Sequence, residues 1–382
     1  MYRYNLKREA DRTVKTLEYE RGISNPGNWY RMKRLFERAK AGEELTIGFL
    51  GGSITQGCLA TKPELCYAYR VYEWWVKTFP QATFHYVNAG IGGTTSHFAS
   101  ARVEADLLSH HVDFAIVEFS VNDDSTEFFR ETYEGVVRHV WQDPCKPAVM
   151  LVHNVYYNTG ANAQIMHAQI GRHYDLPSVS MQSSIYPEVV AGRIPNRAIT
   201  QDDLHPNDNG HELVASVIIY ALEQMLENPS ADSEASLSAP LTENAYEKAF
   251  RLDNRNYEPV CDGFTKDERT QTDITDCFKN GWSATSQGAK LIFTVEASEL
   301  AVQYRRCVSK PAPVALAIVD GDEANAVRLD ANFDEDWGDK LELTPVLIHG
   351  EKKSHTLEIR LVSGDASMPS TFDVISVIGS VK

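Results

Sequence analysis

The stretch Gly51-Gly52-Ser53-Ile54-Thr55-Gln56-Gly57 carries the strongest structural and chemical signal in this sequence. It follows the apolar run 46–50, which the pattern predicts to be a short buried strand. The small residues before Ser53 let the backbone turn sharply at the strand end and let another group approach closely. Ser53 is therefore a candidate nucleophile, although Gly-Gly-Ser is also typical of an ordinary strand-to-helix turn.

A second polar block, Asp202-Asp203-Leu204-His205-Pro206, supplies the side chains that a nucleophilic serine needs. Histidine can remove a proton from a hydroxyl near neutral pH, and a carboxylate can hold the imidazole in the required tautomer. Asp202 stands three residues before His205, so on one compact turn its carboxylate can reach the inner ring nitrogen. We expect Asp203 to point elsewhere. The alternative is a solvated acidic loop that caps the following helix.

Two further windows lie between these blocks. The window 87–96 follows an apolar run near Phe84, and its glycines can direct backbone N–H groups from a strand end toward an oxyanion. The window 114–123 predicts a buried strand that ends at Asn122, whose amide is a neutral donor for the same oxyanion. Plainer interpretations exist for both. The glycines could form a phosphate cradle or a simple turn, and Asn122 could cap a helix.

The order of these four blocks resembles that of the SGNH/GDSL hydrolase superfamily, over the residues from Ser53 to His205. The resemblance implies that Ser53 is the nucleophile and that its own backbone N–H is one oxyanion donor. It implies that Gly93 and Asn122 supply the other two donors. It also makes His205 the base and Asp202 the acid that orients it.

The chain departs from the family pattern at two positions. Gly52 stands where the motif that names the family has Asp, a change that occurs among relatives acting on carbohydrate esters. Val121 stands where many members have Gly, and a larger side chain there would narrow the pocket. Thr55 also argues against the Gly-x-Ser-x-Gly elbow of ordinary α/β-hydrolases, which needs Gly at that position.

Apolar runs alternate with helical patterns between residues 46 and 227, which indicates a parallel sheet with helices on both faces. We therefore predict an α/β fold, an SGNH-type three-layer α/β/α catalytic domain over residues 1–228, with its candidate residues at strand C-terminal ends. The expected strands lie near Ile47, Phe84, Phe114, Ala148 and Ser178. The expected helices are 29–41, 66–78, 97–109, 126–141, 161–174 and 209–227, the first capped by Asn28 and ended by Gly42.

The segment 229–240 is small, polar and bounded by prolines, so it is predicted to be a linker or a surface crossing. Beyond it, residues 241–382 show short strands without a helical pattern, which favours a β-sandwich. The expected strands are 291–295, 300–304, 314–319, 356–361 and 372–378. This part resembles the jelly-roll accessory modules attached to carbohydrate esterases, through its strand pattern and the run 278–283.

Exposed aromatic rings stack on sugars, so Trp282 and Trp337 are candidate substrate-binding residues in the second domain. The alternative for Trp282 is a place in the sandwich core, because large aromatic side chains are mostly buried. The acidic run 334–336 is not sufficient to predict calcium. The six cysteines form no metal motif, and we interpret them as free thiols. Neither a metal nor a cofactor is expected.

The net charge of −16 disfavours nucleic acid and anionic membrane surfaces as partners and suits a neutral substrate. No apolar run reaches membrane-spanning length. The first eleven residues lack the apolar core of a secretory signal, so a cytoplasmic location is expected. Oligomeric state is not indicated by any pattern.

These features favour a serine esterase that removes O-acetyl groups from plant polysaccharides or oligosaccharides through an acyl-enzyme. The resemblance to two-domain hemicellulose deacetylases favours acetylated mannan as the substrate, followed by xylan. Two alternatives stay open: a lipid or thioester hydrolase on the same fold, and a non-catalytic glycan-binding protein. The absence of long apolar lid segments argues against a lipase, and the presence of Ser53, Asp202 and His205 together argues against a pure binding protein.

Overall fold

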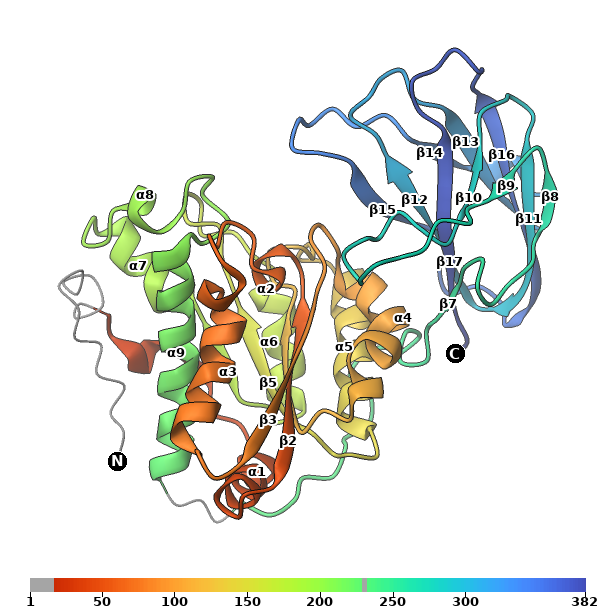
Figure 1. Ribbon diagram of the computed structural model, residues 1–382. Coiled ribbons are helices and arrows are strands. Elements are labelled where there is room, and N and C mark those ends of the chain that lie inside the picture. The colour runs from red at the N-terminus through yellow and green to blue at the C-terminus, as the bar shows by residue number, and fades with distance from the viewer. Residues whose placement is uncertain (1–16, 229–231) are drawn as a thin grey trace. The chain divides into compact units, whose positions relative to one another are not determined.

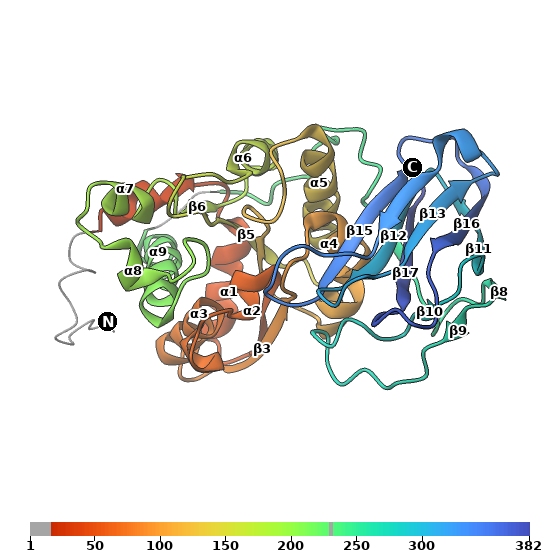
Figure 2. The same ribbon diagram turned by 90° about the horizontal axis from the view of Figure 1, so that it is seen from above.

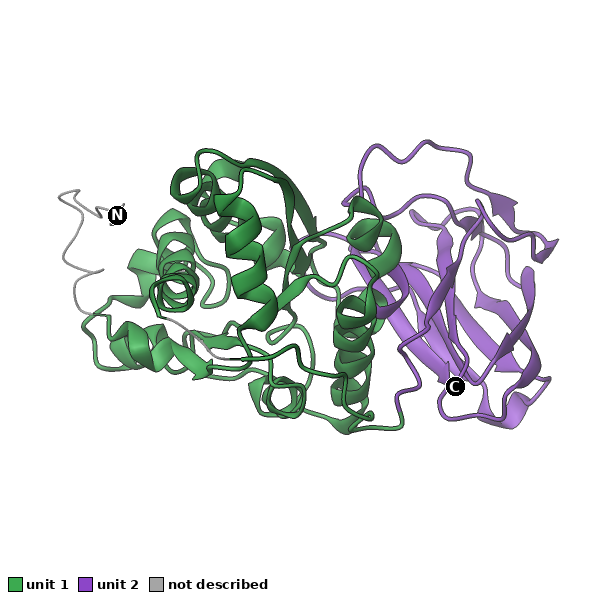
Figure 3. Ribbon diagram, turned by 90° about the horizontal axis from the view of Figure 1, so that it is seen from below, with its two compact units in different colours: residues 1–99, 103–243 green, residues 100–102, 244–382 purple. Residues whose placement is uncertain are grey.

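The computed structural model of the protein describes residues 17–228 and 232–382. The chain divides into two compact units, drawn in separate colours in Figure 3: residues 1–99 with 103–243, and residues 100–102 with 244–382. An α/β unit is followed by a β-sandwich, as expected from the sequence. The predicted domain limits themselves remain a prediction, and residues 229–231 of the predicted linker lie outside the described residues.

The first unit is built on a six-stranded sheet in the order β1-β6-β5-β4-β2-β3. Strands β2 to β6 run parallel, and β1 joins the edge antiparallel to β6. The strands are β1 (Ile23–Asn25), β2 (Glu44–Gly51), β3 (Thr83–Gly90), β4 (Phe114–Glu118), β5 (Ala148–His153) and β6 (Ser178–Ser180). Every residue of β4 and β5 is buried, as expected in a parallel sheet that is covered on both faces.

Helices cover both faces of this sheet and complete the three layers predicted from the sequence (Figures 1 and 2). Helices α1, α3 and α9 lie on one face, and α4, α5 and α6 lie on the other. Their bounds are α1 (Tyr30–Lys40), α3 (Tyr67–Thr78), α4 (Ser96–Asp106), α5 (Glu127–Gln142), α6 (Gln164–His173) and α9 (Asp208–Glu227). Three short helices, α2 (Ser53–Gln56), α7 (Ile185–Val190) and α8 (Asn196–Ile199), lie in loops and were not predicted.

Helix α9 anchors the loop that precedes it against the sheet. Its apolar residues recur at helical spacing and are buried, at Leu213, Val214, Val217, Ile218, Leu222 and Met225. These residues share one core with Trp74 and Trp75 of α3 and with the apolar side chains of the central strands. Burial of this stripe fixes the start of α9, three residues after His205.

Residues 232–243 lie along the first unit as a fixed strap. The Arg138 guanidinium donates to the Ser238 carbonyl at 2.9 Å, and the buried Glu134 carboxylate accepts the Leu241 N–H at 2.6 Å. The part of the predicted linker that the structure describes is therefore a surface crossing tied to helix α5, and not a free tether.

The second unit is an antiparallel β-sandwich. One sheet has the order β15-β12-β17-β10-β9, with β7 also paired to β17, and the other has the order β14-β13-β16-β11-β8. Side chains of both sheets, among them Phe293 and Val377, form one core. The strands are β7 (Phe250–Leu252), β8 (Val260–Asp262), β9 (Thr265–Lys266), β10 (Trp282–Ala284), β11 (Lys290–Ala297), β12 (Glu299–Arg306), β13 (Val314–Val319), β14 (Val327–Asp330), β15 (Lys340–Leu347), β16 (Lys353–Ser363) and β17 (Phe372–Ser380). The five predicted strands correspond to β11, β12, β13, β16 and β17.

Candidate active site

The candidate residues of the first unit follow three neighbouring strands. Gly51 of β2 is paired with Gly90 of β3 and with Glu118 of β4, so the loops after these strands start side by side. Ser53, Gly93 and Asn122 lie in these three loops. Because the carboxyl ends of parallel strands meet at one edge of a sheet, residues far apart in sequence come together there.

Ser53 is the first residue of the short helix α2, directly after β2. The N–H groups of Gly57 and Cys58 both donate to its carbonyl, at 3.0 and 2.9 Å. Gly57 closes this turn with a φ of +103°, a left-handed conformation that glycine adopts without strain. The backbone N–H of Ser53 is therefore left at the open end of a helix, where no intrahelical acceptor exists.

Ser53, His205 and Asp202 are brought together in one chain of hydrogen bonds. Ser53 Oγ lies 2.8 Å from His205 Nε2, and His205 Nδ1 lies 2.6 Å from Asp202 Oδ2. The His205 side chain is 20% exposed and that of Asp202 is 45% exposed. The serine and the imidazole thus meet across 152 residues of sequence, at hydrogen-bonding distance for a nucleophile and its base.

The Asp202 carboxylate is held in place from its own loop. Its Oδ1 accepts the backbone N–H groups of His205 at 2.8 Å and Leu204 at 3.0 Å. Partial burial acts to raise the pKa of Asp202, but the hydrogen bonds from the His205 ring and from these two N–H groups outweigh it and lower that pKa below its usual value. Asp202 is therefore an ionised acceptor for the imidazole.

Asp203 points away from the imidazole, as expected. Both of its carboxylate oxygens accept from the Arg197 guanidinium, at 2.6 and 3.1 Å, and Oδ1 also accepts from Asn196 at 2.5 Å. This pairing ties the acid loop to helix α8. The two neighbouring aspartates thus have different partners, one the imidazole and the other an arginine.

The three expected oxyanion donors are not used within the described part of the chain. Neither the Ser53 N–H, nor the Gly93 N–H, nor Asn122 Nδ2 donates to another described residue. The neighbouring Gly92 N–H is engaged, because it donates to Gln56 Oε1 at 2.7 Å. Gly93 has a φ of +70°, which favours glycine at this turn. Donors without a protein partner are what an oxyanion hole requires.

Gly52 explains one departure from the family motif. A Cβ atom on this residue would come within 2.3 Å of Asn122 Oδ1, closer than any real contact. The Asn122 amide therefore occupies the space in which the side chain of residue 52 would begin. The aspartate found at this position in the name-giving motif has no room here unless Asn122 moves.

His211 is a supporting residue that no sequence pattern marked. Its Nδ1 accepts the Tyr67 N–H at 3.2 Å, and its Nε2 donates to the Cys58 carbonyl at 3.1 Å. It thereby caps helix α3 and fixes the loop that follows Ser53. Burial lowers the pKa of His211 to about 4, so the ring is neutral, as this pair of contacts requires.

Tyr156 is a second side chain that the sequence did not reveal. It is half-buried, and the pKa of its phenol is raised by burial and then by the charges of Asp202 and Asp124. The charges of both carboxylates therefore act on its phenol. It occurs in an ordinary loop, and no spacing in the sequence connects it with His205.

The two tryptophans differ in exposure. Trp282 is only 2% exposed and packs edge-on against Phe293 in the sandwich core, so its expected role as an exposed sugar platform is wrong. Trp337 is 60% exposed and contacts Phe333 edge-on, with ring centroids 5.0 Å apart. The Arg306 guanidinium covers Phe333, 5.1 Å from the centre of its ring. Trp337 thus keeps the properties of a stacking residue.

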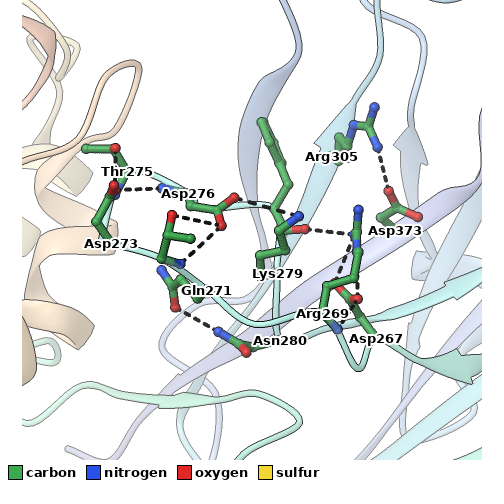
Figure 4. A network of polar contacts seen from close by, with 12 residues as sticks. Asp267, Arg269, Gln271, Asp273, Thr275, Asp276, Lys279, Asn280, Arg305 and Asp373 are labelled. Carbon is green, nitrogen blue, oxygen red and sulfur yellow. Dashed lines mark hydrogen bonds and ion pairs between the residues drawn. The ribbon is translucent and has the colours of Figure 1, made fainter.

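A network of polar contacts holds the irregular segment 267–281 of the sandwich (Figure 4). Asp267 pairs with Arg269 at 2.8 Å, and Arg269 also donates to the Phe278 carbonyl at 3.2 Å. The Arg305 guanidinium donates to Asp373 at 3.0 Å and lies 5.5 Å from the centre of the Phe278 ring. The aromatic residue that begins the run 278–283 is therefore held between charged neighbours.

Residues 17–228 and 232–382 contain neither a metal-binding cluster nor a membrane-spanning helix. No group of three or more His, Cys, Asp or Glu side chains in these ranges is arranged to hold a metal ion. None of the helices they form combines the length and the apolar character needed to span a bilayer. All six cysteines are free thiols, as expected.

The comparison with protein families identifies the class to which this fold and site belong. Residues 49–213 match the GDSL-like lipase/acylhydrolase family. The match contains all five candidate residues of the site, Ser53, Gly93, Asn122, Asp202 and His205. The chain belongs to this family and is a carboxylic ester hydrolase.

Two solved structures extend the similarity to both units. A two-domain esterase active on acetylated mannans, co-crystallised with mannopentaose, is 62% identical, with a TM-score of 0.93 over 96% of this chain and 99% of that chain. Another structure of a two-domain esterase active on acetylated mannans is 61% identical, with a TM-score of 0.95 over the same shares. A search of curated proteins found no match. The predicted two-domain esterase is thus confirmed as a class.

Proposed function

We propose that this protein removes O-acetyl groups from acetylated mannan oligosaccharides, with Ser53 as the nucleophile. One observation carries the proposal: Ser53 Oγ lies 2.8 Å from His205 Nε2. The chain that holds this pair is 62% identical to an esterase active on acetylated mannans, over 99% of that esterase. The substrate class rests on this similarity and the chemistry rests on the geometry.

In the first half of the reaction, Ser53 Oγ attacks the acetyl carbonyl while His205 Nε2 takes the hydroxyl proton. The bond from the carbonyl carbon to the sugar oxygen then breaks, and His205 returns the proton to that oxygen. The deacetylated sugar leaves and an acetyl-enzyme remains on Ser53. Asp202, 2.6 Å from Nδ1, keeps Nε2 free to accept the proton and stabilises the protonated imidazole.

In the second half, His205 removes a proton from a water molecule that attacks the acetyl carbonyl. The bond to Ser53 Oγ breaks, the serine regains its proton, and acetate leaves. In both halves the carbonyl oxygen carries negative charge. The N–H groups of Ser53 and Gly93 and the Asn122 amide are donors for it, and each such donor contributes about 2.7–4 kcal/mol to the transition state.

Trp337 is proposed as a sugar-contacting residue of the sandwich. Its ring is 60% exposed and is held by Phe333. An exposed aromatic face that is held in place loses little entropy when a sugar ring stacks on it. We expect Trp337→Ala to weaken binding of mannan oligosaccharides to the protein and to leave the rate on a small aryl acetate unchanged.

Acetate release from acetylated mannan, compared with acetylated xylan, tests the proposed function. We expect faster release from mannan by the wild-type protein, and loss of each acetyl group seen as a mass decrease of the oligosaccharide. Ser53→Ala should abolish release from both. Ser109→Ala, at an exposed serine outside the site, is the matched control and should behave as wild type.

Two outcomes would contradict the proposal. Equal or faster release from xylan would overturn the substrate class. Full activity of Ser53→Ala would overturn the assignment of the nucleophile. Binding of mannan by wild type without acetate release would show instead that the site only binds glycan.

A further inference from the structure

Asp123 follows the proposed oxyanion residue Asn122 and has a side chain that is 0% exposed. Its two carboxylate oxygens have different partners. Oδ1 accepts the backbone N–H of Ser96 at 2.9 Å, and Oδ2 lies 3.0 Å from Nε2 of the equally buried His167. The reaction as described makes no use of this buried pair. Burial of a carboxylate costs folding free energy unless the group is fully hydrogen-bonded. The contacts of Asp123 are therefore expected to have a structural role.

The contact with Ser96 joins the two loops that carry oxyanion donors. Ser96 begins helix α4, which follows directly on the turn that contains Gly93. The N-cap residue of this helix, Thr95, makes no side-chain capping bond. Asp123 supplies a cap from another loop, where a carboxylate is favoured by the free N–H groups and by the helix dipole. One side chain therefore connects the start of α4 to the loop of Asn122.

The Asn122 amide needs such support, because no hydrogen bond holds it. Asn122 Oδ1 is buried without a partner, and Nδ2 donates to no described residue. Its placement is set by the backbone, where the N–H groups of Asn122 and Asp123 both donate to the Phe119 carbonyl, at 3.0 and 2.9 Å, and by close contact with Gly52. A shift of this backbone would move the amide directly.

His167 fixes the other end of the carboxylate. Its ring stacks on Tyr133 of α5, with centroids 3.7 Å apart and planes within 5°. Its Nδ1 is buried and has no hydrogen-bond partner, so Nε2 carries the proton that Asp123 accepts. Helix α5 also holds Ser96, through a 2.6 Å contact between Ser96 Oγ and Thr132 Oγ1. The carboxylate thus lies in a rigid setting.

We propose that Asp123 is a positioning residue of the esterase: it sets the separation of the Gly93 and Asn122 loops and so holds two oxyanion donors in register. The inference rests on the proposed function, in particular on the role of Asn122. Asp123 does not touch the reacting atoms. Its effect is expected in kcat, because the oxyanion forms only in the transition state.

The first test compares Asp123→Ala with Asp123→Asn. The alanine variant loses both bonds, and we expect kcat to fall by about 10- to 100-fold, since displacement of a catalytic group by roughly 1 Å can cost that much. KM should stay within about twofold. The asparagine variant should keep most of the activity. Its oxygen can still accept from Ser96, which is the bond that joins the two loops, so only the contact with His167 is weakened.

The second test separates positioning from a general loss of structure. An aryl boronic acid forms a tetrahedral adduct with the serine, so its affinity should fall in Asp123→Ala by the same factor as kcat/KM, while mannopentaose affinity stays constant. In the double variant that carries both Asp123→Ala and Asn122→Ala, the fold decrease in kcat should be clearly smaller than the product of the fold decreases in the two single variants. If Asp123→Ala does not fold, His167→Phe can replace it. This substitution removes the Nε2 donor to Asp123 but keeps an aromatic ring stacked on Tyr133, and we expect smaller decreases in kcat and in boronate affinity.

Three results would overturn the inference: wild-type kcat in Asp123→Ala, multiplicative losses in the double variant, or unchanged boronate affinity in a slowed variant. Asn122→Ala alone distinguishes this failure from that of the proposed function. If Asn122→Ala is slow but Asp123→Ala is not, only the positioning role is wrong. If Asn122→Ala has full activity, the assigned oxyanion role itself is wrong.

Discussion

Gly52 and Asn122 occupy adjoining space so closely that a Cβ atom on residue 52 would lie 2.3 Å from Asn122 Oδ1 and 3.0 Å from Nδ2. Replacing Gly52 with Ala should therefore push the amide out of the oxyanion hole. We expect kcat to fall by about 100-fold or more, close to the cost of losing one donor. Steady-state kinetics on an aryl acetate measures this. On an Asn122→Ala background, Gly52→Ala should cost little more, because the colliding amide is gone. A full additional loss there would show that Gly52 matters for another reason.

Asn122→Ala provides the reference for this comparison. The amide is a donor that no other described residue engages, so its removal should slow turnover by roughly 100- to 1000-fold, with most of the loss in kcat. Single-turnover release of the alcohol product would locate the loss in acetylation of Ser53. A rate near that of wild type would mean that the oxyanion is stabilised by other donors.

The adjacent aspartates provide a matched pair. Asp202 accepts from the His205 ring, whereas Asp203 is paired with Arg197. Asp202→Asn places an amide against Nδ1, favours the wrong tautomer, and should reduce kcat by about a thousand- to ten-thousandfold. Asp203→Asn keeps an oxygen for Arg197 and should lose less than about tenfold, since an exposed ion pair contributes little. Equal losses in both variants would contradict the division of roles.

The sequence was sufficient for the elements that have a clear period. Strands β2 to β5 contain apolar runs bounded by turn residues, and the stripe of α9 has helical spacing, so each could be predicted from residue order alone. Strand β6 has only three residues and was expected near Ser178 from the alternation of strands and helices along the chain. Strand β1 could not, because three residues are too short to show a period and only their pairing with Val179 and Ser178 makes them a strand. Strand β15 was missed because charged residues and Pro345 interrupt it at a sheet edge.

The candidate site also contains some residues that could be predicted from the sequence and others that could not. The four blocks gave the residues that meet at the strand ends, because their chemistry and order are both recorded in sequence. His211 and Asp123 act through contacts made by folding. His211 lies outside the four blocks, and the position of Asp123 next to Asn122 does not reveal which groups its carboxylate contacts. Trp282 shows the opposite error, since the polar run around it suggested a surface position although large aromatic residues are mostly buried, and its burial decided between the two.

The buried His211 should make the free energy of unfolding depend on pH. Its pKa is lowered by burial to about 4 in the folded protein, from a usual value of 6.5. Between these values the unfolded chain binds a proton that the folded chain does not, so the free energy of unfolding should fall as pH decreases from 6.5 to 4. The contribution of this group is about 1.4 kcal/mol per pH unit within that window.

Denaturant unfolding of wild type and His211→Gln at several pH values checks this. The variant should be less stable at pH 8, because the contacts with Tyr67 and Cys58 are weakened, but its stability should fall less steeply below pH 6.5. His110→Gln, at an exposed histidine, controls for the loss of one imidazole. Parallel curves for wild type and His211→Gln would show that His211 does not stay neutral in the fold.

The buried Glu118 should make the free energy of unfolding depend on pH with the opposite sign. The side chain is fully buried at the end of β4, and burial raises the pKa of its carboxyl to about 7, from a usual value of 4.5. Between these values the folded protein holds a proton that the unfolded chain releases, so the stability contributed by Glu118 is complete below pH 4.5 and is lost as pH rises to 7. The loss amounts to at most about 3 kcal/mol.

Glu118→Gln removes this ionisation but keeps the contacts of the neutral side chain. Its amide oxygen can still accept from the Ser120 N–H and hydroxyl, which lie 3.2 Å from Glu118 Oε1. The variant should match wild type at pH 4.5 and exceed it in unfolding free energy at pH 8. Glu64→Gln, at an exposed position, controls for the loss of one charge. A stability gain that is the same at both pH values would mean that packing, and not the buried charge, is the cause.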